Sequence, residues 1–251
     1  MMDLSHLGKE VHRRYDELGI IQVFDDGNKR YLSFGTADEQ SCQLRSRPDQ
    51  PQHEYTRAMF AIITLLNEPQ RAAVLGVGGG VLIRALFSYF HTLHIDAVDL
   101  RRAVILIAQQ HFGLPRDLRI QAVHLPATDY LKQASPGSLN VLFSDLYLAE
   151  GLDKSQLCND YLQLCASALA DDGWLVLNLW KEHREDGRML PLLRHHFATV
   201  LHATTMDGNW IVWANKSQIT MDKKEIRQQA KRLSASLGFN LWQAARGFFR
   251  H

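Results

Sequence analysis

The chain has 251 residues, 46% hydrophobic and 22% charged, which is ordinary for a soluble globular protein with one sizeable domain. A net charge of +1 excludes the broad positive field of a nucleic-acid-binding or membrane-surface protein, so we expect neither partner. Cys42, Cys158 and Cys165 form no C-x-x-C pair, and no apolar run is long enough to cross a bilayer. We therefore expect a cytoplasmic protein with reduced thiols.

The first fifty residues predict a small element of their own. Residues 5–18 predict one short amphipathic helix. Two β-prone runs flank Asp26-Gly27, which is a hairpin signal, and residues 39–44 add a third strand. We expect an N-terminal helix and small β-element over 1–50, and a second domain over 51–251.

From residue 51 onward, predicted helices and strands alternate. The strands are 72–75, 94–99, 118–123, 139–145 and 174–180; the helices are 53–66, 81 onward, 102–112, 127–133, 155–169 and 187–195. A turn is expected over 171–173, a closing hairpin over 199–203 and 210–214, and a last helix over 222–237. This order predicts an α/β fold with a doubly wound sheet and an antiparallel edge hairpin.

A glycine-rich turn follows the first of these strands. The strand over 72–75 runs into Gly76-Val-Gly-Gly-Gly80, a helix begins at Val81, and the next strand ends on Asp99. Glycine lets the backbone approach a ligand closely, the new helix offers free N–H groups, and the carboxylate can accept both ribose hydroxyls. The order therefore predicts a nucleoside-binding site; a glycine turn without any ligand is the structural alternative.

The glycine spacing separates two classes of nucleotide ligand. Val81 stands where the dinucleotide fingerprint has its third glycine. This favours S-adenosylmethionine or a relative over NAD, because such a ligand has no pyrophosphate to bind. The residues expected to contact it are Gly76, Gly78, Gly79, Gly80, Asp99 and Leu100.

Asp145 follows the strand over 139–145, at the same edge of the sheet as Asp99. An alkylamine is mostly protonated at neutral pH and then has no lone pair for attack. A carboxylate can bind that cation, align it and take its proton. The sequence therefore predicts Asp145 as the catalytic residue, with a helix-capping role as the alternative.

Several segments between Ile20 and Ala214 together resemble one family. They are Arg30-Tyr-Leu-Ser-Phe-Gly35, Gln40-Ser41, Glu54-Tyr55-Thr-Arg-Ala-Met59, Val74-Leu-Gly-Val-Gly-Gly-Gly80, Ala97-Val-Asp-Leu100, His111-Phe-Gly-Leu-Pro115 and Asn140-Val-Leu-Phe-Ser-Asp145. The chain resembles the spermidine synthase-like aminopropyltransferases, a branch of the class I S-adenosylmethionine-dependent methyltransferase fold. The resemblance implies a Rossmann-like methyltransferase sheet of seven strands.

The resemblance also implies an activity and the residues that carry it. The family transfers an aminopropyl group from decarboxylated S-adenosylmethionine to putrescine, without a metal. By this likeness Gln40 contacts the donor, Tyr55 faces the amine, and Asp145 is the acceptor-side carboxylate. Tyr147 and Glu150, in the loop after Asp145, are candidate acceptor contacts, with solvated loop residues as the alternative. A homo-oligomer is implied in the same way.

The chain departs from the family pattern at acidic positions. Leu148 replaces a second acid after Asp145, Val81 replaces a donor-side acid, and Pro126 lies where an acid faces adenine. Glu54, Glu150 and Asp153 are candidates to replace the acceptor-side acid. Two alternatives therefore stay open: a methyltransferase using intact S-adenosylmethionine, and a non-catalytic nucleoside-binding homologue.

Overall fold

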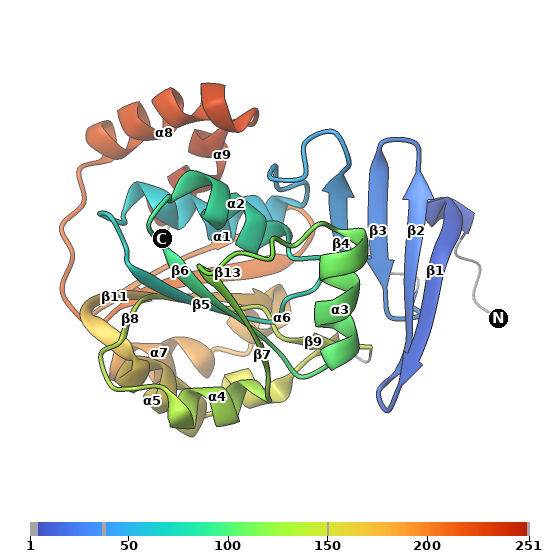
Figure 1. Ribbon diagram of the computed structural model, residues 1–251. Helices are drawn as coiled ribbons and strands as arrows, with labels where there is room; N and C mark the ends of the chain where they lie inside the picture. The colour runs from blue at the N-terminus through green and yellow to red at the C-terminus, as the bar shows by residue number, and fades with distance from the viewer. Residues whose placement is uncertain (1–4, 37–38, 150, 250–251) are drawn as a thin grey trace.

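The computed structural model describes residues 5–36, 39–149 and 151–249. Two large sheets dominate it: a four-stranded N-terminal sheet and a seven-stranded sheet covered by helices on both faces (Figure 1). Among the described residues, no helix is both long and apolar enough to cross a membrane.

The seven-stranded sheet has the predicted doubly wound order, β12-β13-β11-β8-β5-β6-β7. Its strands are β5 (Arg71–Leu75), β6 (His94–Asp99), β7 (Ile120–His124), β8 (Leu139–Ser144), β11 (Leu169–Trp180), β12 (Thr199–Thr204) and β13 (Asn209–Asn215). Strand β13 is antiparallel to both of its neighbours, β11 and β12. The α/β fold class and the antiparallel edge hairpin are confirmed.

Helices cover the two faces of this sheet (Figure 1). On one face lie α1 (Glu54–Phe60), α2 (Val81–Tyr89), α3 (Arg102–His111), α8 (Lys223–Leu237) and α9 (Leu241–Ala245). On the other lie α4 (Ala127–Gln133), α5 (Asn159–Ala168) and α7 (Met189–His196). Strand β5 shows why both faces are apolar: Ala72 and Val74 pack on the first side, and Ala73 and Leu75 on the second.

The N-terminal sheet corrects one prediction. Residues 5–18 form no amphipathic helix: only η1 (Ser5–Leu7) is helical, and β1 (Lys9–Asp16) is a strand. Strand β1 pairs with β2 (Gly19–Asp26), followed by β3 (Lys29–Ser33) and β4 (Glu39–Leu44). The hairpin at Asp26-Gly27 and the strand over 39–44 are confirmed.

Other differences from the sequence prediction are local. The expected turn at 171–173 lies inside β11, where the pairing with β8 shifts register between Leu169 and Trp174. The helix expected over 53–66 continues past α1 as the 3-10 turn η2 (Ala61–Thr64), and 155–169 splits into η3 (Lys154–Leu157) and α5. Four further short elements were not predicted from the sequence: β9 (Tyr147–Leu148), β10 (Gly151–Leu152), α6 (Lys181–Glu185) and η4 (Arg246–Phe249).

Polar contacts fasten the N-terminal sheet to the larger one. The Arg101 guanidinium pairs with Asp16 at 2.7 Å, and both side chains are largely buried. Gln43 donates to the Phe112 carbonyl over 2.8 Å, and the Gly79 N–H donates to Ser41 Oγ over 2.9 Å. Strand β4 is thereby held against the glycine turn through Ser41.

Candidate active site

The glycine turn is shaped by what lies against its backbone. Gly76 has a φ of +91° and Gly78 of +51°, values that side chains rarely permit. A Cβ at Gly76 would collide with the Asp145 carbonyl oxygen, and one at Gly78 would lie 2.8 Å from Ser41 Oγ. The turn therefore passes directly between the end of β8 and Ser41 of β4.

Asp99 is held at the end of β6 by backbone donors. The Val77 N–H donates to one carboxylate oxygen over 2.9 Å, and the Arg101 N–H donates to the other over 2.8 Å. Burial raises the pKa of Asp99, whereas these two N–H groups lower it. Since each carboxylate oxygen can accept more than one hydrogen bond, both can still accept from a ribose hydroxyl.

Asp145 follows β8 and is half-buried. Burial raises the pKa of its carboxyl group to about 6, and a hydrogen bond from the Asn178 side-chain amide, 2.8 Å long, acts in the opposite direction. The carboxylate is therefore mostly ionised at neutral pH but close to its titration range, which suits a group that takes up a proton.

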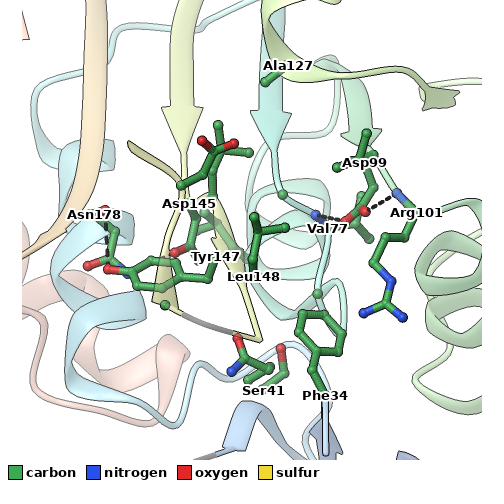
Figure 2. Close-up of a pocket in the computed structure, with 18 of the residues that line it drawn as sticks. Phe34, Ser41, Val77, Asp99, Arg101, Ala127, Asp145, Tyr147, Leu148 and Asn178 are labelled. Carbon is green, nitrogen blue, oxygen red and sulfur yellow. Dashed lines mark hydrogen bonds between the residues drawn. The ribbon is translucent and has the colours of Figure 1, made fainter. Parts of the chain in front are cut away.

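A cavity of about 840 Å³ joins these features. Figure 2 shows Asp145 and Asn178 on one side of it, and Asp99 with Arg101 on the other. The cavity is lined by most of the residues predicted from the sequence: Gln40, Tyr55, Gly76, Gly78, Asp99, Leu100, Asp145 and Tyr147. The structure thus brings the predicted donor-side and acceptor-side residues into one pocket.

Two predicted residues, Gly79 and Gly80, are not among the described residues that line the cavity. Gly79 and Gly80 are buried behind it, with Ser41 and Phe112 packed against Gly79 and Leu114 against Gly80. Their contact with a donor stays a prediction. Glu150 lies outside the described residues.

An aromatic wall closes the cavity beside Asp145. The Tyr147 hydroxyl donates a long hydrogen bond, 3.4 Å, to the Asn178 carbonyl oxygen. The Trp180 ring lies 5.9 Å from that of Tyr147 and is 40% exposed. Trp180 therefore lines the pocket and is not a core residue.

The cavity wall also contains polar residues that were not predicted from the sequence. Asn209 Nδ2 donates to Asn178 Oδ1 over 3.0 Å, so these two amides and Asp145 form a chain. The sequence signal for Asn178 is a single polar residue inside the apolar strand over 174–180. Asp207 and His53 also line the cavity.

The three apolar replacements of family acids also face this space. Val81, Pro126 and Leu148 all line the cavity. Val81 is 6% exposed and begins α2. By likeness to the family pattern, the donor side lacks two carboxylates, at Val81 and Pro126, and the acceptor side lacks one, at Leu148.

No family model matches the chain. Curated relatives do: it is 26% identical over 239 residues to the polyamine aminopropyltransferase of Neisseria meningitidis, which covers 90% of this chain and 88% of the relative. It is 27% identical over 240 residues to that of Chromobacterium violaceum, covering 92% and 89%.

Solved structures show the same fold. A probable spermidine synthase from Corynebacterium glutamicum has a TM-score of 0.77 at 17% identity, covering 94% of each chain. A spermidine synthase in complex with the transition state analogue AdoDATO has a TM-score of 0.75 at 14% identity, covering 97% of this chain and 85% of that one. Human methyltransferase-like protein 13 in complex with SAH has a TM-score of 0.66 at 22% identity, covering 74% and 93%.

The sheet order and the solved structures define the Rossmann-like methyltransferase fold, and the curated relatives identify the chain as a transferase homologue. The spermidine synthase matches cover 94% and 97% of this chain, a share that includes most of its N-terminal sheet as well as the larger sheet. The chain is a spermidine synthase-like homologue of the polyamine aminopropyltransferases.

Proposed function

We propose that the protein transfers an aminopropyl group from decarboxylated S-adenosylmethionine to an amine such as putrescine. One observation carries the proposal: Asp145 and Gly76 both line the cavity, and the Asp145 backbone carbonyl packs directly against Gly76 at the adjoining ends of β8 and β5. An amine held by Asp145 therefore lies next to a nucleoside held at the glycine turn.

The reaction needs no redox partner. The neutral amine nitrogen attacks the propyl carbon attached to the sulfonium, and an N–C bond forms as the C–S bond breaks. The electron pair of that bond goes to sulfur, which leaves as the neutral thioether of methylthioadenosine. The proton lost by the amine passes to the Asp145 carboxylate, whose half-buried position raises its affinity for a proton.

The donor side of the cavity suits an adenosyl ligand. Asp99 has both carboxylate oxygens oriented by the Val77 and Arg101 backbone, as ribose recognition requires. Gln40, Leu100, Gly76 and Gly78 line the space beside it, and we assign them to the donor. AdoDATO in one structural neighbour and SAH in another support a donor of this class.

The acceptor side is assigned to the half of the cavity around Asp145. Tyr55 and Tyr147 line it, and burial raises the pKa of both phenols, so both hydroxyls stay protonated at neutral pH. They can each accept an amine hydrogen or wall its methylene chain. We assign both to acceptor binding.

A direct assay tests the proposal. The protein is incubated with decarboxylated S-adenosylmethionine and a panel of amines, and methylthioadenosine is measured by mass spectrometry. Asp145→Asn keeps the side-chain shape and removes the base, so we expect the rate to fall about 100-fold or more with donor affinity retained. No methylthioadenosine from the wild-type protein with any amine would show that the proposal is wrong.

Val81 favours one alternative, methyl transfer from intact S-adenosylmethionine. It places an apolar side chain on the cavity wall where the family has a donor-side acid, and the intact donor does not need that acid as strongly. Calorimetric binding of the two donors separates the reactions. A tenfold preference for the intact donor would favour methyl transfer.

We extend the proposal to organisation and location. Residues 1–50 would supply the wall at Ser41 and Gln40, and residues 51–251 the adenosyl-binding catalytic domain. All three cysteines are free thiols, which supports a cytoplasmic enzyme. A homo-oligomer is proposed from family likeness alone.

A further inference from the structure

A diamine acceptor brings two ammonium groups, and Asp145 can bind one. An ammonium taken from water needs a counter-charge or full hydrogen bonding. Leu148, beside Asp145 in Figure 2, supplies neither. The second cation must therefore find its partner elsewhere on the cavity wall, if the proposed amine transfer is correct.

Asp207 lies on that wall, in the turn between β12 and β13. Hydrogen bonds hold the turn in place at both neighbours of Asp207. The Met206 N–H donates to the Glu54 carboxylate over 2.8 Å, and the Lys181 N–H donates to the Gly208 carbonyl over 2.9 Å. The backbone that carries Asp207 is thus fixed to the start of α1 and to the start of α6.

The same hairpin reaches Asp145 through side chains. Asn209, two residues after Asp207, donates to Asn178, which donates to Asp145. Asp145 is therefore hydrogen-bonded, through Asn178, to the strand that follows Asp207. The two aspartates face the same cavity from different strands, Asp145 at the end of β8 and Asp207 ahead of β13.

The charge of Asp207 is available to a ligand. Its side chain is exposed, and it has no ion pair within the described ranges. His53 also lines the cavity, and its pKa is affected by the charge of Asp207, but His53 does not neutralise that charge. Burial lowers the pKa of His53 to about 4, although the Asp207 charge acts to raise it, so the imidazole is uncharged at neutral pH.

We propose that Asp207 binds the far ammonium of a diamine or longer polyamine whose near amine lies at Asp145. This inference rests on the proposed function, and it names the acceptor class: an unbranched amine with a second cationic nitrogen. Asp207 takes the place of the acid that Leu148 lacks, from a different part of the chain. It is a specificity-determining residue, because a monoamine has nothing to place there.

The test compares two amines of equal chain length, 1,4-diaminobutane and n-butylamine. Their binding to protein saturated with methylthioadenosine is measured by calorimetry for the wild type, Asp207→Ser, Asp207→Glu and Asp26→Ser. Asp26 is a matched control, because it is also an exposed aspartate directly before glycine in a hairpin turn, and it does not line the cavity. Serine is accepted at such turn positions.

We expect the wild type and Asp26→Ser to bind the diamine at least about tenfold more tightly than the monoamine. Asp207→Ser should lose about tenfold in diamine affinity and nothing in monoamine affinity, and Asp207→Glu should keep most of the preference. Equal losses for both amines, an unchanged preference in Asp207→Ser, or no preference in the wild type would each overturn the inference.

Turnover separates this inference from the proposed reaction. Wild-type protein that makes methylthioadenosine while Asp207→Ser keeps its diamine preference would refute the role of Asp207 alone. Wild-type protein that makes none refutes aminopropyl transfer, and the binding comparison still decides the role of Asp207, because it uses the nucleoside product and needs no reaction.

Discussion

Asn178 donates a hydrogen bond to Asp145 from the neighbouring parallel strand, with 2.8 Å between Nδ2 and Oδ1. The register of the sheet explains the contact. Leu177 of β11 pairs with Ser144 of β8, so the residues that follow them, Asn178 and Asp145, lie side by side. The amide is therefore in place before any substrate arrives, as preorganised stabilisation of a carboxylate requires.

Asn178→Ala should move the pH dependence of the reaction. The amide stabilises the ionised form of Asp145, so its removal raises the pKa of that carboxyl above its present value of about 6. We expect the acid limb of the kcat/KM profile to shift to higher pH and the rate at pH 7 to fall. Asn140→Ala, at the other end of β8, should leave the limb where it is. An unshifted limb in Asn178→Ala would contradict the role of this amide.

Asp145→Asn should stabilise the protein at neutral pH. The carboxyl pKa is about 6 in the folded protein against 3.8 as reference, so the folded state binds more protons between these values. The contribution of the Asp145 carboxyl group to the free energy of unfolding of the wild type is then highest below pH 4, and it falls as the pH rises through 6. The cost of ionisation reaches about 3 kcal/mol at pH 7, an upper estimate for a half-buried group.

Urea unfolding of both proteins at pH 5 and pH 7.5 measures this effect. The free energy of unfolding of Asp145→Asn should exceed that of the wild type, and by a larger margin at pH 7.5. A margin that is the same at both pH values would rule out a raised pKa for Asp145.

Gly76→Ala should destabilise the fold at the site itself. The new Cβ collides with the Asp145 carbonyl oxygen, and the backbone has a φ of +91°. Gly137→Ala is the matched control, because its φ is +68° and nothing lies within 4 Å of the new Cβ. Backbone strain alone costs about 1–3 kcal/mol, so Gly137→Ala should lose that much and Gly76→Ala more. Thermal unfolding compares the two; equal losses would show that the collision is relieved without cost.

Asp16→Asn should loosen the N-terminal sheet. It leaves the Arg101 guanidinium, whose side chain is 5% exposed, without its charged partner. Breaking a buried pair on one side costs about 3 kcal/mol, and we also expect weaker donor binding, because Arg101 lines the cavity. Asp186→Asn breaks an exposed pair with Arg188 and should leave the unfolding midpoint unchanged. Equal effects of the two substitutions would argue against the Arg101 contact as an anchor.

The fold was largely predictable because its strands are apolar runs separated by strong turn and glycine signals. Strand β1 was predicted as a helix because Val11 and Tyr15, its exposed apolar residues, are four positions apart, as on a helical face. Pairing with β2 decides the structure there, and pairing between strands is not visible in a local pattern.

The site was predictable where a residue directly follows its own strand. Asp99, Gly76 and Asp145 were found in this way, because parallel strands end at one edge of the sheet. Asn178 and Asp207 were missed. They reach the cavity through the register of β11 and through the turn before β13, and neither follows from nearby sequence.

The cavity has one wall from β4 and another from the turn between β12 and β13. Ser41 and Asn209 therefore have to be present together before the space is enclosed, although they are separated by most of the chain. A growing polypeptide on the ribosome can form the N-terminal sheet and the glycine turn early. The proposed nucleoside site is not enclosed until the hairpin has emerged, so we expect binding at this site to report that synthesis and folding of these parts are complete.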